Sequence, residues 1–338
     1  MSSRRKTTLS DVAMAANCSI ATVSRAMSQP ALVQPETLER IRNAADRLGY
    51  VPNRKARALA SGQSDTVGVV VPTLNSPIFS AALQEMQRSF AANGYQLLIA
   101  SHEYDLGHET AALSQLISHG ADGLVVVGAE RPQSSWSMIE AAGVPIVQMW
   151  EGRSGHDRVT VDNHLAGYLV ARYMLDIGHR QFGVICGQLQ NNDRQQARVA
   201  GIRSALAEEG LTLPRTQISE QPLTIAAGRS GCMTLLEMLP RPTAIIGTAD
   251  LLAIGAMIEA QARGIAVPQT ISFAGIDNVD VAAHLAPSLT TVDIPAALIG
   301  AETAVMLLRR IREGARAADE ALTLPVTLVV RHSTAPPP

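Results

Sequence analysis

The sequence predicts an α/β protein with a small helical headpiece at its start and two doubly wound parallel-sheet lobes behind it. Before residue 52, apolar residues recur at helical spacing in three short stretches. From Thr66 onward, short β-branched runs alternate with longer helical stretches, and this alternation begins again near residue 162. The chain has 338 residues, of which 46% are hydrophobic, so it is long enough for two or three domains with their own cores.

The first predicted helix has a start signal, an apolar face and an end signal. Thr8 can cap this helix with Asp11 as its reciprocal partner. Val12 and Ala15 would form its apolar face. Asn17 tolerates a left-handed backbone, so the helix is expected to end there.

The second predicted helix has the form of a recognition helix for the DNA major groove. Ser19 is expected to cap it, while Val23 and Ala26 face inward. The residues on its other side are Ile20, Ala21, Ser24 and Arg25. A helix that presents its N-terminal residues and an arginine outward can reach base edges. An ordinary helical hairpin is the alternative interpretation.

A third helix is expected from Pro35 to Gly49, and a basic segment follows it.

Charge is divided unequally along the chain. Residues 1–62 contain 10 Lys+Arg and 4 Asp+Glu, a net charge of +6. The remaining 276 residues contain 18 and 26, a net charge of −8. A basic head on an acidic body indicates that the head binds a polyanion.

Cysteine use and hydropathy limit the remaining classes. Cys18, Cys186 and Cys232 are odd in number and far apart, which favours reduced thiols over a disulfide frame or a zinc site. The 8 histidines show no metal-ligand spacing. No apolar stretch follows Arg4-Arg5-Lys6, and no run approaches the ~18 apolar residues that span a bilayer. We therefore expect a soluble cytoplasmic protein without a cofactor.

The body is predicted to contain alternating strands and helices. Strands are expected at 66–72, 97–101, 123–127, 146–149, 159–162, 182–186, 244–248 and 271–275. Helices are expected at 78–93, 107–119, 134–142, 165–177, 195–209, 225–239 and 251–263. Apolar strands separated by helices imply parallel sheets covered on both faces, and two such lobes place a ligand in the cleft between them.

The first 60 residues resemble the DNA-binding headpiece of the LacI/GalR (lactose repressor) family of bacterial transcription regulators. The resemblance is carried by Thr-Val-Ser-Arg at 22–25, Leu-Gly-Tyr-x-Pro-Asn at 48–53 and Arg-Ala-Leu at 57–59. It implies a headpiece at 1–52, a hinge helix at 53–63 and an effector-binding and dimerisation core at 64–338.

The core of that family is similar to the periplasmic sugar-binding proteins, in which the chain crosses between lobes three times. Lobe 1 would comprise about 64–162 and 293–323, and lobe 2 about 163–292 and 324–333. A helix at 295–313 would belong to the first lobe and a strand at 324–330 to the second.

The resemblance also implies a set of DNA-binding residues. Ile20, Ala21 and Arg25 would read bases, with Arg25 pairing with guanine and the first two making only apolar contacts. Hydroxyl and amide groups suited to phosphates are those of Thr8, Ser19, Thr22, Ser24 and Asn53, for which local capping is an equal alternative. The hinge would contribute Asn53, Arg54, Ala56 and Leu59, with Leu59 wedging into the minor groove.

In the cleft, three polar residues match the effector-binding motifs of the family. Arg198 can fork onto ligand hydroxyls or a carboxylate, and Asp250 and Asp277 follow strand ends, where open α/β sheets place ligands. Each aspartate could instead be a helix N-cap. Asn75, Phe79 and Trp150 are expected to complete the walls. Ala249 departs from the family, which often has Asn there, so one ligand contact would be missing.

Two stretches, Gly128-Ala-Glu-Arg131 and 143–151, resemble the gluconate-repressor branch. They favour a sugar acid such as gluconate as effector, with a neutral sugar as the alternative. The predicted partners are pseudo-palindromic operator DNA, this effector and a second copy of the chain, and no membrane. An enzyme is disfavoured because the chain lacks a phosphate-binding glycine motif and a nucleophile elbow. A transport binding protein would lack the basic helical head.

Overall fold

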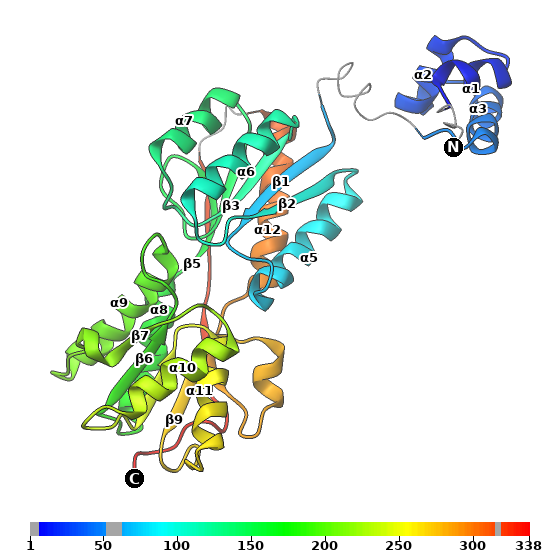
Figure 1. Ribbon diagram of the computed structural model, residues 1–338. Coiled ribbons are helices and arrows are strands. Elements are labelled where there is room, and N and C mark those ends of the chain that lie inside the picture. The colour runs from blue at the N-terminus through cyan, green and yellow to red at the C-terminus, as the bar shows by residue number, and fades with distance from the viewer. Residues whose placement is uncertain (1–6, 52–62, 315–318) are drawn as a thin grey trace, which may run out of the picture. The chain divides into compact units, whose positions relative to one another are not determined.

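The computed structural model describes residues 7–51, 63–314 and 319–338 and forms two compact units, Met1–Asp65 and Thr66–Pro338. Figure 1 shows the elements of each unit in chain order. Asn53, Arg54, Ala56 and Leu59 lie outside the described residues, so their hinge and DNA-binding roles stay predictions.

The described part of the first unit consists of α1 (Leu9–Ala15), α2 (Ile20–Ser28), the 3-10 turn η1 (Pro30–Leu32) and α3 (Pro35–Leu48). The capping prediction at Thr8 is confirmed, because its hydroxyl accepts from the Asp11 amide while the Asp11 carboxylate accepts from the Thr8 amide at 2.8 Å. Asn17 has a positive φ of 48° between α1 and α2, and Gly49 ends α3 with a φ of 60°.

The core of this unit is small. It consists of Val12, Ala13, Ala16, Val23, Ala26, Ile41, Ala44 and Ala45. The prediction that Ala15 belongs to the apolar face is wrong: Ala15 is exposed, and Ala16, four residues after Val12, is buried instead. Arg40 Nε donates to the Ala16 carbonyl at 2.9 Å, which fastens α3 to the end of α1.

The first lobe of the second unit contains six strands. They are β1 (Thr66–Val71), β2 (Gln96–Ser101), β3 (Gly123–Val127), β4 (Ile146–Trp150), β5 (Asp157–Val161) and β11 (Ala321–Leu324), in the order β11-β5-β4-β3-β1-β2. All neighbouring pairs are parallel. One face is covered by α5 (Pro77–Ala92) and α12 (Ala296–Glu313), and the other by α6 (Leu106–Ser118) and α7 (Gln133–Ala142).

The second lobe repeats this plan. Its strands are β6 (Phe182–Cys186), β7 (Ile218–Glu220), β8 (Ala244–Gly247), β9 (Ser272–Asp277), β10 (Thr290–Asp293) and β12 (Thr327–Val329), in the order β12-β10-β9-β8-β6-β7. Only β12 is antiparallel to its neighbour. The helices α8 (Asn163–Asp176) and α9 (Asp193–Glu208) cover one face, α10 (Ile225–Leu236) and α11 (Asp250–Ala262) the other, and η2 (Arg215–Gln217) and η3 (Asp280–His284) lie in loops.

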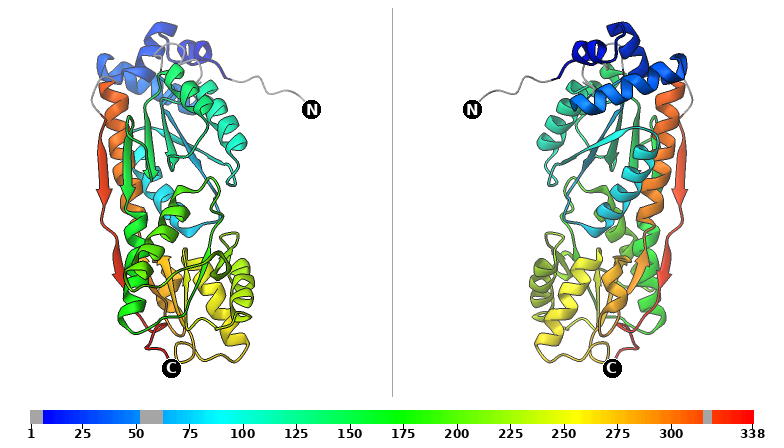
Figure 2. Two further views of the ribbon diagram at one scale, coloured as in Figure 1. Left: turned by 90° about the vertical axis from the view of Figure 1, so that its left-hand side faces the viewer. Right: turned by 90° about the vertical axis from the view of Figure 1, so that its right-hand side faces the viewer.

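Three connections join the two sheets, after β5, after β10 and between β11 and β12. Figure 2 shows β11 and β12 in red, one after the other, β11 in the upper lobe and β12 in the lower lobe. The strand expected at 324–330 in the second lobe is present as β12 but begins only at Thr327, because Leu324 ends β11 in the first sheet and Pro325 has no amide hydrogen for a ladder. The strand β11 itself was not predicted. The short strand β7 and the strand β10 were not predicted.

Side chains explain why β1 reads as a continuous apolar run. Val67, Val69 and Val71 pack toward α5, and Val70 packs on the other side against α6. Both lobes are therefore doubly wound, which confirms the predicted fold class. No helix among the described residues is long and apolar enough to cross a membrane.

Candidate DNA-binding surface and ligand pocket

The exposed face of α2 carries four of the predicted DNA-binding residues. Ile20 is 51% exposed, and Ala21, Ser24 and Arg25 are exposed as well, whereas Val23 and Ala26 are buried in the headpiece core. The spacing of the two buried residues fixes which side of α2 faces outward. This side is free of the headpiece core and offers an arginine together with two small or apolar side chains.

The polar residues at the starts of α1 and α2 are engaged locally. The Ser19 hydroxyl accepts from the Thr22 amide at 3.1 Å and lies 2.8 Å from the Thr22 hydroxyl. The Thr8 hydroxyl donates to Asp11 at 2.7 Å. Capping therefore accounts for Thr8, Ser19 and Thr22, although their exposed oxygens still lie at helix N-termini, which attract phosphates.

In the second unit, a pocket lies where the strands of both sheets end. Its lining comes from Ser76, Pro77, Ile78, Phe79, Tyr104, Trp150, Asn192, Arg194, Gln195, Arg198, Leu223, Ala249, Leu251, Asp277 and Val279. These residues lie at or after the ends of β1, β2 and β4 in the first lobe and of β6, β7, β8 and β9 in the second. The carboxyl ends of doubly wound strands are where such sheets bind ligands.

Arg198 is held in one orientation at the pocket. Its Nη1 donates to the Thr248 carbonyl at 2.7 Å and to Asp277 Oδ1 at 2.9 Å, and its Nε donates to Asn163 Oδ1 at 2.9 Å. Arg198 is 4% exposed, so these bonds replace water around a buried charge. Burial raises the pKa of Asp277, and Arg198 opposes that rise. The pair presents a fixed donor and acceptor to the pocket.

The apolar wall is an aromatic pair. Phe79 and Trp150 meet edge to face, with ring centroids 4.9 Å apart and planes at 83°. Trp150 has a positive φ of 64°, as has Tyr104, and Asp277 has a φ of 132°. Left-handed backbone at bulky residues costs energy and gathers at functional sites. Three such residues around one pocket support its assignment as a binding site.

Two predicted pocket residues lie elsewhere. Asn75 is exposed in the loop before α5 and is not part of the lining. Asp250 is fully buried behind the wall, where it accepts from the Val279 amide at 2.9 Å and the Thr291 hydroxyl at 2.5 Å. It is not the N-cap of α11 either, because Ala249 holds that position. Asp250 shapes the loop after β9 instead of facing the pocket.

Several lining residues escaped sequence reasoning. Tyr104, Asn192, Arg194 and Gln195 all line the pocket. Arg194 precedes Arg198 by four residues and therefore shares its face of α9, a spacing that could have identified it. Gln195 accepts from the Gly187 amide at 2.8 Å and from the Thr248 hydroxyl, which ties α9 to the ends of β6 and β8.

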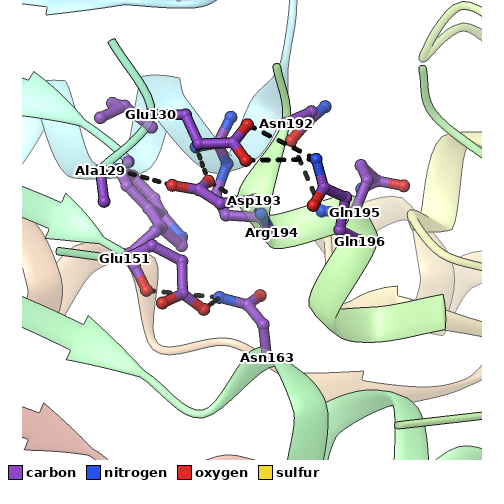
Figure 3. A network of polar contacts seen from close by, with 12 residues as sticks. Ala129, Glu130, Glu151, Asn163, Asn192, Asp193, Arg194, Gln195 and Gln196 are labelled. Carbon is purple, nitrogen blue, oxygen red and sulfur yellow. Dashed lines mark hydrogen bonds and ion pairs between the residues drawn. The ribbon is translucent and has the colours of Figure 1, made fainter. Parts of the chain in front are cut away.

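Polar contacts join the two lobes beside the pocket. Asp193 Oδ2 accepts from the Ala129 amide at 2.6 Å, and Gln196 Nε2 donates to Glu130 at 3.3 Å. Asn163 donates to Glu151 at 3.0 Å and to the Trp150 carbonyl at 3.3 Å. Figure 3 shows Glu130 reaching toward Gln196 and Asp193 toward Ala129. The described residues contain no group of three or more His, Cys, Asp or Glu able to hold a metal.

Comparison with known proteins agrees with this architecture. A model described as "Bacterial regulatory proteins, lacI family" matches residues 8–53, and a periplasmic binding protein-like domain matches 171–334. The chain is 32% identical over 335 residues to the HTH-type transcriptional repressor PurR of Klebsiella pneumoniae, covering 98% of each.

Two solved structures are similar along the chain. The lac repressor dimer bound to operator and an anti-inducer has a TM-score of 0.85 and 25% identity, covering 98% of this chain and 100% of that one. The regulator CelR in complex with cellobiose has a TM-score of 0.71 and 28% identity, covering 97% and 100%. The fold, the exposed face of α2 and these matches define a DNA-binding transcriptional repressor with a ligand-binding core, not an enzyme. The chain belongs to the lacI family of bacterial regulatory proteins.

Proposed function

We propose that this protein is a homodimeric repressor that binds a pseudo-palindromic operator through α2. Its operator affinity changes when a small sugar acid such as gluconate, or a sugar, binds in the pocket between the lobes. The genes under its control would serve carbohydrate or sugar-acid metabolism.

The DNA side of the proposal rests on the exposed face of α2. Arg25 would pair with guanine in the major groove, while Ile20 and Ala21 contact a thymine methyl group. One helix-turn-helix reads only a half-site, so two copies of the chain are needed for a full operator. Leu59 would add the minor-groove wedge.

The ligand side rests on one observation: a guanidinium fixed between Thr248 and Asp277 stands beside an aromatic wall. Carboxylate and guanidinium groups pair with hydroxyls in defined directions, and an aromatic ring packs on the apolar face of a sugar. A purine base would also stack on this wall, so purines belong in the same test.

The first experiment screens ligands by thermal shift. The panel contains aldonates, neutral sugars, their phosphates and purines. A ligand present at about 100 times its Kd stabilises the folded state by about 2.7 kcal/mol. Operator sites selected from a random duplex pool then show whether the stabilising ligand changes DNA affinity. A purine that stabilises the protein while all sugars fail would overturn the proposed ligand class.

The pocket assignment is tested with Arg198→Ala and Arg198→Lys. Both should bind operator near normally and lose the ligand response. The alanine variant leaves the Asp277 carboxylate unpaired, and breaking a buried ion pair lowers the free energy of unfolding by about 3–5 kcal/mol. If the alanine variant does not fold, the lysine variant, which keeps a positive charge, still provides the test. Arg203→Ala, an exposed position on the same helix, is the matched control. An unchanged response in Arg198→Lys would contradict the assignment.

A further inference from the structure

Arg194 differs from Arg198 in how much of its guanidinium is used. Arg194 is 8% exposed and lines the pocket. Its one side-chain bond among the described residues runs from Nη1 to its own neighbour Asp193, at 2.8 Å. Arg198, four residues on, is bonded through two nitrogens to three different partners. The hydrogens on Nε and Nη2 of Arg194 are therefore available to a molecule in the pocket.

The charge of Arg194 reaches the first lobe across the pocket. His102 and Tyr104 follow β2. Burial and then Arg194 lower the pKa of His102 to about 4. Burial raises the pKa of Tyr104, and Arg194 is the leading influence against that rise. Arg198 is paired with Asp277 at 2.9 Å and Arg194 with Asp193 at 2.8 Å. Arg194 pairs through Nη1 alone, so its Nε and Nη2 hydrogens can still be accepted by an anionic group on the ligand.

We propose that Arg194 binds the acid group of the effector and thereby selects acidic ligands over their neutral counterparts. This inference rests on the proposed function, namely a hydroxylated ligand in this pocket. The acid group can be a carboxylate or a phosphate, since both accept two hydrogen bonds from a guanidinium.

Asp193 positions Arg194 and ties it to the first lobe. One oxygen of its carboxylate accepts from Arg194, and the other accepts from the Ala129 amide at 2.6 Å. Gly128 lies so close that an added Cβ would stand 2.5 Å from Arg194 Nη1. The acid-binding cation is thus held in place by a contact across the lobes. Recognition of the acid group and closure of the lobes consequently depend on the same carboxylate.

The test compares ligands that differ only in the acid group. Calorimetric titration uses gluconate against glucitol for the carboxylate, and glucose 6-phosphate against glucose for the phosphate. Arg194→Gln should weaken binding of the acid member about tenfold or more, which corresponds to about 1.4 kcal/mol, and change the neutral member less than about twofold. Arg194→Lys should restore part of the loss. Asp193→Asn should weaken the acid member selectively, whereas a purely structural role would weaken both members equally.

The outcomes separate the inference from the proposed function. Equal losses for acid and neutral ligands in Arg194→Gln would overturn the role of Arg194 while leaving a ligand-controlled repressor in place. If the wild-type protein binds only neutral sugars, the role of Arg194 in binding an acid group is also overturned, while a ligand-controlled repressor remains in place. If no sugar or sugar acid binds the wild-type protein, the proposed ligand class fails, and this inference fails with it. If Arg194→Gln loses affinity for gluconate alone, the recognised group is a carboxylate. If it loses affinity for glucose 6-phosphate alone, the recognised group is a phosphate.

Discussion

The exposed residues of α2 differ in the contacts that they can offer to DNA. Arg25 is the only cation on its exposed face within the described helix, and its neighbours Ile20 and Ala21 can offer apolar contact alone. In the proposed complex, bidentate hydrogen bonding to a base would therefore depend on the Arg25 guanidinium.

The substitution Arg25→Ala tests this role. It should cost about 1–3 kcal/mol on the operator and much less on random duplex DNA, because a bidentate contact to guanine is lost. Fluorescence anisotropy at fixed salt measures both affinities. Arg42→Ala removes the same charge from an exposed site on α3 and should affect the two DNAs alike. Equal losses for Arg25→Ala on both DNAs would make Arg25 a phosphate contact.

Gly128 offers a second test at the scale of one residue. It has a φ of 79°, and an alanine Cβ would stand 2.8 and 2.9 Å from the two Asp193 oxygens. Gly128→Ala should therefore lower ligand affinity about tenfold. It should also lower the free energy of unfolding by about 1 kcal/mol, because alanine is strained at this positive φ. Gly120→Ala is a matched control, since Gly120 has a φ of 78° and nothing within 4 Å of its added Cβ. Ligand affinity that falls equally in both variants would separate Gly128 from the pocket.

At the scale of the elements, the buried carboxyl group of Asp250 joins α11 to the loop after β9 and to β10. Burial, followed by the charge of Asp277, raises the pKa of Asp250 from 3.8 to about 7. The folded chain therefore holds this proton more tightly than the unfolded chain. The resulting stabilisation is complete below about pH 3.8 and is lost as the pH rises to about 7.

Asp250→Asn should remove this dependence. An asparagine can accept from the Val279 amide and donate to the Thr291 hydroxyl, so the local contacts persist. Between pH 4 and 7 one proton contributes a slope of up to about 1.4 kcal/mol per pH unit, which the variant should lose. Urea unfolding of both proteins at several pH values measures this. A wild-type slope retained in the variant would show that another group carries the proton.

The elements themselves were largely predictable, and their exceptions have physical causes. β1 and β3 read directly from apolar runs because helices cover both faces of their sheet. β7 has only three residues, too few for a periodic signal. β11 was missed because it has only four residues, and its last residue, Leu324, was assigned to the strand expected at 324–330.

The pocket was predictable only in part. Four of the predicted residues line the pocket: Phe79, Trp150, Arg198 and Asp277. They were predicted from their positions near strand ends and from the motifs of the family. Whether a carboxylate at a strand end faces the pocket depends on the loop beyond it, which is why Asp250 turns toward Val279 and Thr291 instead. Arg194 lacked a motif of its own.

At the scale of the whole molecule, the proposed function requires that operator binding and effector binding are linked. If the effector changes operator affinity by some factor, operator changes effector affinity by the same factor. We expect calorimetric titration of the effector with and without operator to give this reciprocal value, and half-site duplexes to bind far more weakly than full sites because two copies of the chain are needed. Equal affinity for half-sites and full sites would argue for a monomeric reader.

The three crossings between the sheets also constrain how the protein is made on the ribosome. The first lobe needs α12 and β11 to complete its layers, and the second needs β12 together with Ser333, which accepts from the Thr290 amide at 2.8 Å. The headpiece is continuous in the sequence and can fold while synthesis proceeds. Neither lobe can complete its sheet until β11 and β12 have left the ribosome, so both lobes should become protease-resistant together at that point of synthesis.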